Sequence, residues 1–381
     1  MGIHFKGSVG PTLGIEMELE LVDRGTRELK SAASSILFEV TGSPDLLHPK
    51  IKHELLECCL EIITGICTTV GEARRDLEAT LLELQTPIAD RNIGLLCSGT
   101  HPFSKWYEQD VSPGPRYAAL MEDTQWAGRR LQIFGVHFHV GVSSGTKAIA
   151  ITNALASYIP HFLALSSSSP FWGGHDTGLA SARSKVFEAL PTAGLPYMLG
   201  SWEEFEQFMD TLISAHAIKS IREVWWDIRP HPEFGTVEIR VCDGLPSFAE
   251  VEALAALAQC LVAQLDGLDD RGFTLPAPRE WIVRQNKWRA GRYGLEAEII
   301  VDESGTLLPL RQAIAHTVEE LTPTASRLGC DKELAGVLDI MNRGPSATRQ
   351  RDIVARGGSL LDVVDALVDE LDTGAAKPAW L

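Results

Sequence analysis

Three glutamates alternate with apolar residues near the beginning of the chain. Residues 12–22, TLGIEMELELV, place Glu16, Glu18 and Glu20 at every second position. Alternate residues of a β-strand lie about 6.6 Å apart on one face, so three such carboxylates repel one another unless cations or bases lie among them. The period of two therefore predicts a strand with a cation-binding acidic face, and an edge strand with solvated acids is the alternative.

Two histidines share one face of a second predicted strand. The run 133–142, IFGVHFHVGV, sets His137 and His139 opposite its apolar side chains, between Gly135 and Gly141. The glycines leave room for a ligand or another backbone to approach. Hydrogen-bonded structural histidines and a zinc site are the alternatives, but the acidic strand offers mainly the oxygen ligands that suit Mg²⁺ or Mn²⁺.

A third predicted strand combines a carboxylate with an arginine. In residues 236–241, TVEIRV, Glu238 and Arg240 lie on one face, and Arg229 precedes a proline in the upstream segment WWDIRP. An arginine beside a carboxylate forms an ordinary salt bridge, whereas in a site with bound metals its parallel N–H donors bind phosphate oxygens. Three strands therefore each combine an apolar face with a face suited to metal or phosphate chemistry.

Two further segments carry charge that the three strands do not explain. Residues 53–61, HELLECCLE, space Glu54, Glu57 and Glu61 as on one helix face, or the last two as on one strand face. Their apolar flank favours a position in the same cavity over a solvated amphipathic helix. Residues 284–294, RQNKWRAGRYG, gather four basic residues in an acidic chain, which favours anion binding and a solvated basic helix equally.

Helices must position these strands. The spacing of apolar residues predicts helices over 70–90, near 147–166, near 201–219 and over 248–265. The last is mostly apolar, so we expect it behind the sheet. A Ser/Gly-rich loop lies at 166–178, and from about residue 276 the pattern is helical. Because no repeat or long linker interrupts residues 1–381, we expect a single domain with a helical C-terminal part.

The composition argues against several classes of function. Among 381 residues, 34 Lys and Arg stand against 51 Asp and Glu, a net charge of −17, which repels nucleic acid and anionic membranes. Seven cysteines without a CxxC pair argue against a disulfide framework or a structural zinc site. We find no run approaching the ~18 apolar residues of a membrane span and no signal peptide, so we expect a cytoplasmic protein.

Five motifs together resemble one family in order and spacing. They are GIEMELE, HELLECCLEI, GVHFHVG, IRPHPEFGTVEIRVCD followed by an Ala/Leu-rich helix, and RYGLE. Over about residues 11–365 they are similar to the YbdK-type carboxylate-amine ligases of the glutamate-cysteine ligase type 2 family. The resemblance implies an α+β fold like the catalytic domain of glutamine synthetase, with a curved antiparallel sheet backed by helices and Mg²⁺ on its open face.

The resemblance also implies roles for individual residues. The metal ligands would be Glu16, Glu18, Glu57, Glu61, His137 and Glu238. ATP would be bound by His139, Arg229, Arg292 and Asn286. Catalytic roles would fall to Arg240, Arg229 and Glu57, and binding of the substrate to Arg183 and Arg240. No glycine-rich phosphate loop is present, so a nucleotide would depend on these metals, histidines and arginines.

The implied reaction is ATP-dependent amide formation. A carboxylate attacks the γ-phosphate of ATP, and an amine then displaces phosphate from the acyl phosphate, while Mg²⁺ offsets the repulsion between the anions. The implied partners are a small carboxylate and a small amine, such as the amino acids glutamate and cysteine, and a homodimer is compatible with the pattern. A metal-dependent amide hydrolase of the same fold and a non-catalytic nucleotide-binding module are the alternatives.

Overall fold

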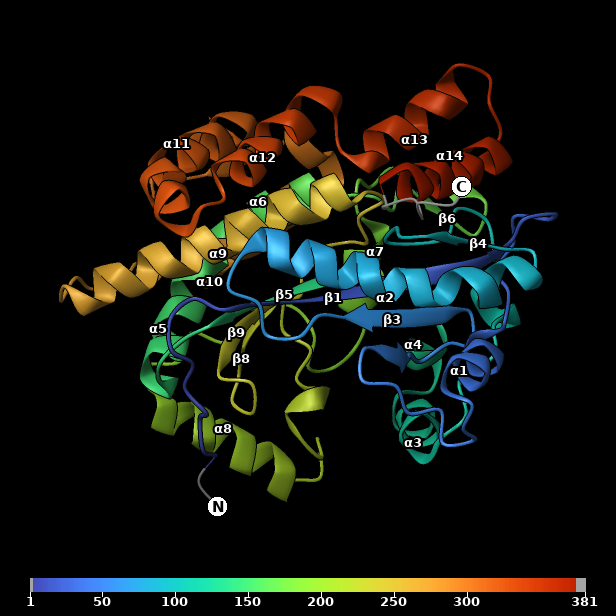
Figure 1. Ribbon diagram of the computed structural model, residues 1–381. Helices are drawn as coiled ribbons and strands as arrows, with labels where there is room; N and C mark the ends of the chain where they lie inside the picture. Colours follow the sequence, from blue (N-terminus) through green and yellow to red (C-terminus); the bar gives the residue numbers. More distant parts are fainter. Residues whose placement is uncertain (1–2, 375–381) are drawn as a thin grey trace.

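An antiparallel sheet forms the centre of the protein (Figure 1). The computed structural model describes residues 3–374, in which this sheet has seven strands in the order β2-β3-β1-β5-β9-β8, with β4 paired to β1. The strands are β1 (Leu13–Asp23), β2 (Ile51–His53), β3 (Cys59–Ile63), β4 (Ile93–Leu96), β5 (Val136–Gly141), β8 (Ile228–His231) and β9 (Thr236–Ile239). The three strands predicted from alternating residues are confirmed as β1, β5 and β9, which lie side by side.

Alternation places apolar and acidic side chains on opposite faces of β1. Ile15, Met17 and Leu19 are buried, whereas Glu16 and Glu18 on the other face are half-buried. The helices that contact the sheet include α2 (Val70–Asp90), α5 (Gly145–Leu155) and α9 (Phe248–Asp270). Burying one large apolar side chain is worth roughly 1.5–3 kcal/mol, so the apolar faces of the strands determine which side of the sheet carries the acids.

The two longest of these helices begin where side chains satisfy their free N–H groups. At α2, the Thr69 hydroxyl accepts from the Glu72 N–H and the Glu72 carboxylate accepts from the Thr69 N–H, which forms a capping box. At α9, the Ser247 hydroxyl accepts from the N–H of Glu250. The spacing of apolar residues predicts helices over 70–90 and 248–265, and α2 and α9 confirm both. Helix α9 continues five residues further, to Asp270.

The segment between β5 and β8 is more broken than the spacing predicts. A 3₁₀ turn interrupts the first helix, and the Ser/Gly-rich loop holds a small hairpin. These elements are η2 (Ala156–Tyr158), α6 (Ile159–Ser166), β6 (Phe171–Trp172), β7 (His175–Asp176) and α8 (Trp202–Ser214). The other short elements before α9 are α1 (Ala33–Thr41), η1 (Trp106–Glu108), α3 (Pro115–Thr124), α4 (Trp126–Arg129), α7 (Ala182–Phe187) and η3 (Ile221–Glu223).

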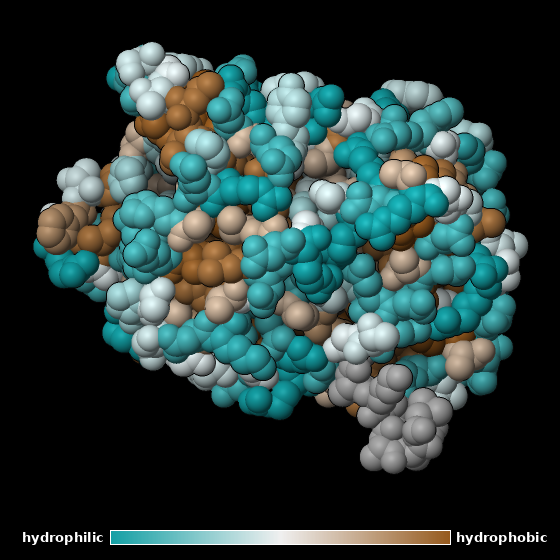
Figure 2. Space-filling view, turned by 90° about the horizontal axis from the view of Figure 1, so that it is seen from above, coloured by the Kyte–Doolittle hydropathy of each residue, from teal (hydrophilic) through white to brown (hydrophobic). Residues whose placement is uncertain are grey.

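The C-terminal part is helical from α10 onward, as the sequence predicts. Its helices are α10 (Glu280–Tyr293), η4 (Gly294–Glu296), α11 (Leu310–Leu328), α12 (Asp331–Arg343), α13 (Ser346–Ala355) and α14 (Leu360–Gly374). An unexpected hairpin of β10 (Glu298–Ile300) and β11 (Leu307–Pro309) interrupts them. Helices α11–α14 lie on the α9 side of the sheet, away from α3 and α8 (Figure 1). Seen from above, the molecule is mostly hydrophilic with separate hydrophobic patches (Figure 2).

One apolar core joins the sheet to the C-terminal helices. Its buried residues run from Leu13 in β1 to Leu371 in α14, which favours the expectation of a single domain. Within residues 3–374, two helical stretches, Gly145–Ser166 and Phe248–Asp270, are apolar and long enough to cross a membrane, which corrects the sequence-based expectation. However, 78% of each apolar window is buried inside the protein, so both stretches serve as core helices here.

Candidate active site

A cavity of about 790 Å³ opens on the polar face of the sheet. Its floor consists of side chains from the central strands, and its walls include residues of α3, η3 and the β8–β9 hairpin. Six of the residues assigned from the sequence line it: Glu16, Glu18, Glu61, His137, Arg229 and Arg240. His139 and Glu238 are buried and contact these lining residues.

Strand register brings the site residues opposite one another. Glu16 of β1 lies opposite His137 of β5, and Glu18 of β1 lies opposite Glu61 of β3. Directly opposed residues of an antiparallel pair have Cβ atoms about 4.5–5.5 Å apart on the same face. A slip of one residue in either pairing would turn one partner toward the helices. The chemistry of the site therefore depends on register, which no single strand encodes.

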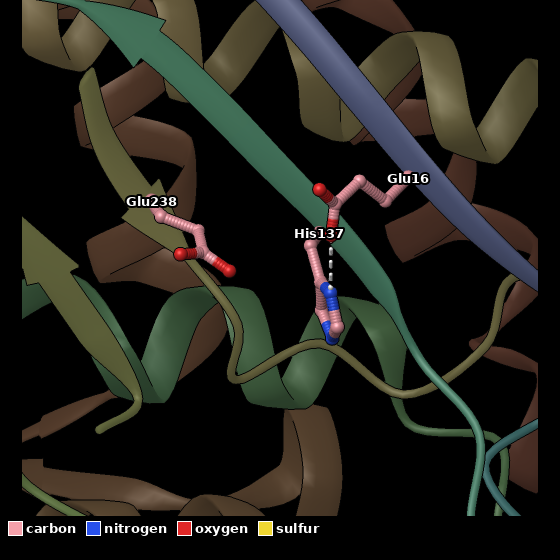
Figure 3. Close-up of side chains that lie close together, drawn as sticks. All are labelled: Glu16, His137 and Glu238. Atoms are coloured by element: carbon pink, nitrogen blue, oxygen red, sulfur yellow. Dashed lines mark hydrogen bonds and ion pairs between the residues drawn. The ribbon is translucent and has the colours of Figure 1, made fainter. Parts of the chain in front are cut away.

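Glu16, His137 and Glu238 form one candidate metal site on three neighbouring strands (Figure 3). Their ligand atoms all lie within 4.8 Å of one another. The Nδ1 atom of His137 lies 3.1 Å from the Glu16 carboxylate. Its Nε2 atom is buried and has no hydrogen-bond partner in the described part of the chain. A buried nitrogen without a partner costs free energy, so this imidazole fits a role as a metal ligand.

Glu18, Glu61 and His137 form a second candidate metal site, which shares His137 with the first. Burial raises the pKa of the Glu18 carboxyl to about 8, and the charge of Glu54 adds to this effect. Burial and the charges of Glu16 and Glu54 likewise raise the pKa of Glu61 well above its ordinary value. These carboxylates therefore repel one another, and a bound divalent cation would offset that repulsion.

Two arginines and a histidine neutralise Glu238. The Nε atom of Arg229 donates to one carboxylate oxygen over 2.6 Å, and Arg240 donates to the other. The Nε2 atom of His139 lies 3.8 Å from Glu238 and 3.2 Å from Glu16. Burial alone raises the pKa of the Glu238 carboxyl, but these cationic groups outweigh burial and hold that pKa well below its ordinary value.

The two arginines differ in the donors that remain free. Arg229 also donates to the backbone carbonyls of Ile221 and Val224, over 2.8 and 2.7 Å, and so ties β8 to η3. Arg240 lines the cavity, and its Nε atom has no partner among the described residues. Arg240 is therefore better placed than Arg229 to donate to a bound anion.

The donor set fits the Mg²⁺ or Mn²⁺ expected from the sequence. Each group of three combines two carboxylates with one imidazole. Mg²⁺ and Mn²⁺ prefer oxygen ligands, whereas zinc sites are richer in histidine and cysteine. All seven cysteines are free and buried, and none belongs to either group. The residues present therefore match a hard divalent cation better than zinc.

The third glutamate of the acidic strand does not join the site. Glu20 is fully buried, and its Oε1 atom accepts from the N–H and the hydroxyl of Ser98, over 3.2 and 2.8 Å. Burial raises the pKa of this carboxyl well above its ordinary value. Of the three alternating glutamates of β1, Glu16 and Glu18 therefore line the cavity, whereas the core encloses Glu20.

Glu57 neither lines the cavity nor belongs to either candidate metal site, and its expected roles as metal ligand and catalytic residue stay predictions. The segment 53–61 forms a turn between β2 and β3 rather than one helix or one strand. In that turn the Glu57 carboxylate accepts from the backbone N–H and the hydroxyl of Ser34, at the beginning of α1. Glu54, from the same turn, lines the cavity instead. The acidic composition of this segment indicated that it supplies a carboxylate to the cavity. The spacing of its glutamates did not show whether that carboxylate is Glu54 or Glu57.

Arg183 does not line the cavity either, and its expected role in binding the substrate stays a prediction. It is 4% exposed, and its guanidinium lies 3.4 Å from the backbone carbonyls of Arg240 and Val241. A Cβ atom on Gly135 would lie only 2.4 Å from this guanidinium. The glycine therefore makes room for Arg183 rather than for a ligand, and the arginine supports the end of β5.

Asn286 and Arg292 also lie outside the cavity lining. The side-chain amide of Asn286 donates to the carbonyl of Ile300 over 2.8 Å and accepts from its N–H over 2.7 Å, so it ties α10 to β10. Arg292 donates to the carbonyl of Gly178 and lies over the ring of Tyr293. These contacts connect both side chains to the surrounding scaffold, and their expected roles in ATP binding stay predictions.

The fold is that of solved glutamate–cysteine ligases. The ligase from Francisella tularensis, in complex with AMP, matches with a TM-score of 0.71 over 99% of this chain and 92% of that one, at 14% identity. A bifunctional glutathione synthetase from Pasteurella multocida matches with a TM-score of 0.67 over 95% of this chain and 52% of that one, also at 14% identity. The α+β class with an antiparallel sheet backed by helices is thereby confirmed.

Sequence comparison then places the chain in a family. The profile of Glutamate-cysteine ligase family 2 (GCS2) matches residues 12–370. A protein of Frankia casuarinae named "Putative glutamate--cysteine ligase 2-1" is 55% identical over 98% of both chains. One of Thermobifida fusca named "Putative glutamate--cysteine ligase 2" is 52% identical over 98% of this chain and 94% of the relative. The chain belongs to glutamate-cysteine ligase family 2, as its motifs predict.

Proposed function

We propose that this protein is an ATP-dependent carboxylate–amine ligase that forms an amide through an acyl phosphate. The observation that carries the proposal is the pair of candidate metal sites that share His137, with Arg240 beside them. In this reaction a carboxylate must approach the γ-phosphate of ATP, and divalent cations held by Glu16, His137 and Glu238 and by Glu18, Glu61 and His137 would offset the repulsion between the two anions. Membership of glutamate-cysteine ligase family 2 supports the same reaction.

Arg240, Arg229 and His139 have different roles in the proposed reaction. Arg240 lines the cavity, where its guanidinium would donate to the oxygens of the transferring phosphoryl group. Arg229 is a positioning residue, because its donors hold Glu238 and the backbone of η3. Burial lowers the pKa of His139, but the charges of Glu238 and Glu16 raise it above its ordinary value. A protonated His139 therefore adds positive charge on the side where phosphate would bind.

The proposed substrates are two small molecules of the amino-acid class, one supplying the carboxylate and the other the amine. A cavity of about 790 Å³ falls in the range of about 300–1,000 Å³ that is usual for small-molecule sites. The relatives are named for glutamate and cysteine, which makes these two amino acids the first pair to test. The seven free thiols support a cytoplasmic location, where cysteines stay reduced.

Turnover with pairs of amino acids tests the proposal. The protein is incubated with ATP, Mg²⁺ and each pair, ADP is followed by a coupled assay, and the amide is identified by mass spectrometry. A ligase forms one ADP for each amide. Cleavage of an amide without matching use of ATP would favour the hydrolase, and ATP binding without either reaction would favour the nucleotide-binding module. Glu16→Gln, which removes one metal-site charge at constant volume, serves as the inactive control.

A further inference from the structure

Lys287 is the buried member of the basic segment 284–294. It lies on α10 and is 3% exposed, whereas the three arginines of that segment are half-buried or exposed. Its Nζ atom donates to both carboxylate oxygens of Asp227, over 2.9 and 2.6 Å, and lies 2.7 Å from the Glu188 carboxylate. Burial lowers the pKa of the Lys287 amine, but the charges of these two carboxylates raise it above its ordinary value. Lys287 is therefore a charged side chain enclosed by two acids, and serves neither an anion site nor a solvated helix face.

The backbone of Asp227 holds Arg240. Asp227 directly precedes β8, and its carbonyl accepts from the N–H of Arg240 over 2.8 Å. Because β9 ends at Ile239, this bond continues the pairing of β8 and β9 by one residue, at the point where the Arg240 side chain enters the cavity. The N–H of Asp227 donates to the carbonyl of Gly194 over 2.7 Å. A movement of Asp227 would therefore move the backbone of Arg240.

Glu188 links the same lysine to a wall of the cavity. It follows the last residue of α7, and Phe187 before it and Leu190 after it line the cavity. Its carboxylate also accepts from Lys185 over 2.7 Å. Neither Glu188 nor Lys287 lines the cavity itself. One buried amine therefore connects α10 both to the arginine end of the site and to the α7 wall.

The charges of this group contribute geometry more than net stability. Removing charges from water offsets much of their mutual attraction, and apolar side chains of similar volume often give equal stability at such positions. Lys287 brings three N–H donors to three carboxylate oxygens, all within 2.9 Å. Charge-assisted hydrogen bonds fix the relative positions of the groups that they join. The group therefore holds α10, Asp227 and Glu188 in one arrangement, which keeps Arg240 at a constant position.

We propose that Lys287 is a positioning residue that holds Arg240 at the transferring phosphoryl group through the backbone of Asp227. This inference rests on the ligase function proposed above. A displacement of about 1 Å that originates far from the reacting atoms can lower turnover on the order of 100-fold. Since the proposed contact of Arg240 forms in the transition state, its displacement lowers kcat and leaves the KM for ATP nearly unchanged.

Steady-state kinetics in a double-mutant cycle test this role, with the pair of amino acids that gives the highest amide yield. Lys287→Met removes the amine and keeps an unbranched side chain. It should lower kcat for ADP formation at least about tenfold and change the KM for ATP less than about twofold. In the Arg240→Ala background the same substitution should lower kcat by less than about a further twofold, because Lys287 acts through Arg240. Lys287→Arg keeps the charge and should return kcat to within about threefold of wild type.

Hydrogen exchange measures the position of Arg240 without any reaction. Deuterium uptake of the intact protein is followed by mass spectrometry at residue resolution. The Arg240 N–H, which donates to Asp227, should exchange at least about tenfold faster in Lys287→Met than in wild-type protein. The amides of β1 should keep their wild-type rates, which separates a local movement of Arg240 from a general loss of stability.

Lys147 provides a matched control. Its Nζ atom lies 2.7 Å from a carboxylate oxygen of Asp266 and 2.7 Å from one of Asp270, so it is also a lysine held by two acids. It joins α5 to α9 and does not line the cavity. Lys147→Met should leave kcat, the KM for ATP and the exchange of the Arg240 N–H at their wild-type values.

A second variant keeps the test decisive if Lys287→Met does not fold. The double variant Lys287→Met/Asp227→Asn removes both charges of the buried pair, and Glu188 retains Lys185. The backbone of Asp227 remains but loses its tie to α10, so this variant should show the same loss of kcat and the same faster exchange. Circular dichroism and the melting temperature verify that each variant folds.

Three results would contradict the inference. They are wild-type kcat in Lys287→Met, a loss of kcat that adds fully to that of Arg240→Ala, and unchanged exchange of the Arg240 N–H. Failure of the ligase function looks different, because no pair of amino acids then gives an amide. Faster exchange without amide formation would keep the link between Lys287 and Arg240 and overturn the ligase, whereas amide formation with fully additive losses would do the reverse.

Discussion

Glutamate side chains lie at both ends of the cavity, but the charges that surround them differ in sign. At one end, Arg229, Arg240 and His139 surround Glu238 and hold the pKa of its carboxyl well below the ordinary value. At the other end, burial and the charge of Glu54 raise the pKa of Glu18 to about 8. Since burial acts in the same direction on both carboxyls, the neighbouring charges decide the direction of the shift.

This difference indicates which end of the cavity a bound cation would stabilise. The chain's own arginines neutralise Glu238, so that end is charge-balanced without a ligand. Glu18, Glu54 and Glu61 lack comparable partners, and the pKa of each is raised. Unpaired buried charges cost several kcal/mol or take up a proton instead. Metal binding and pH should therefore affect the stability of one end much more than that of the other.

Replacing Glu238 by glutamine should have the largest effect. The substitution leaves the buried guanidinium groups of Arg229 and Arg240 without their shared carboxylate, which costs about 3–5 kcal/mol of unfolding free energy. It also removes a metal-site charge and should lower ADP formation on the order of 100-fold. Urea denaturation and the ADP assay measure the two effects.

Glu61→Gln is the matched substitution at the other end. It should lower ADP formation comparably, because Glu61 belongs to the second candidate metal site. However, the metal-free protein should keep its stability or gain some, since the substitution relieves repulsion among like charges. Equal destabilisation by Glu238→Gln and Glu61→Gln would break the comparison between the two ends.

Arg240→Lys should lose nearly as much turnover as Arg240→Ala, on the order of 100-fold for both, with a smaller cost in stability for the lysine variant. Lysine keeps the charge beside Glu238 but lacks the Nε donor that is free in Arg240. Turnover measured at saturating ATP decides whether Arg240 binds phosphate through parallel N–H donors or only balances the charge of Glu238. A lysine variant within a few-fold of wild-type turnover would leave Arg240 as a counterion only.

The pH dependence of stability should differ with and without Mg²⁺. Because the pKa of the Glu18 carboxyl is raised to about 8, the folded metal-free protein holds a proton that the unfolded chain releases near the ordinary value of 4.5. Stability from this group is therefore greatest below that ordinary value and is lost as pH rises toward 8. Melting temperatures measured in EDTA should fall across this window, and Mg²⁺ should reduce the fall.

Glu18→Gln provides the control for this pH effect. Glutamine does not titrate, so the variant should show a flatter pH profile in EDTA and a smaller response to Mg²⁺. A fall in melting temperature that persists unchanged in Glu18→Gln would assign the effect to other groups and contradict the prediction.

Glu57→Gln should have the smallest effect. The Glu57 carboxylate accepts hydrogen bonds from Ser34 at the beginning of α1, so loss of its charge should cost about 0.5–1 kcal/mol of unfolding free energy. ADP formation should stay at the wild-type level, whereas Glu54→Gln, three residues earlier in the same turn, should lower it. Equal losses of activity in Glu57→Gln and Glu54→Gln would contradict this prediction and indicate that Glu57 takes part in the reaction.

The sequence by itself determined which side chains share a face. Glu16 and Glu18, the two histidines of β5, and Glu238 all lie on the faces that their alternate spacing predicts. Side-chain direction along a strand is set locally, because successive residues point to opposite sides. The spacing of apolar residues predicted α2 and α9 for the same reason, since each periodicity depends only on residues close in the chain.

Only the tertiary structure decided which charged residues enter the cavity. Glu54 and Glu57 belong to one acidic segment, yet the turn between β2 and β3 places the first in the cavity and the second against Ser34. Arg183 likewise packs against the backbone of Val241 and does not line the cavity. These partners lie far away in the chain, so their contacts arise only when the strands pair and the helices pack. A local pattern supplies charge and periodicity, whereas long-range packing selects the partner of each charge.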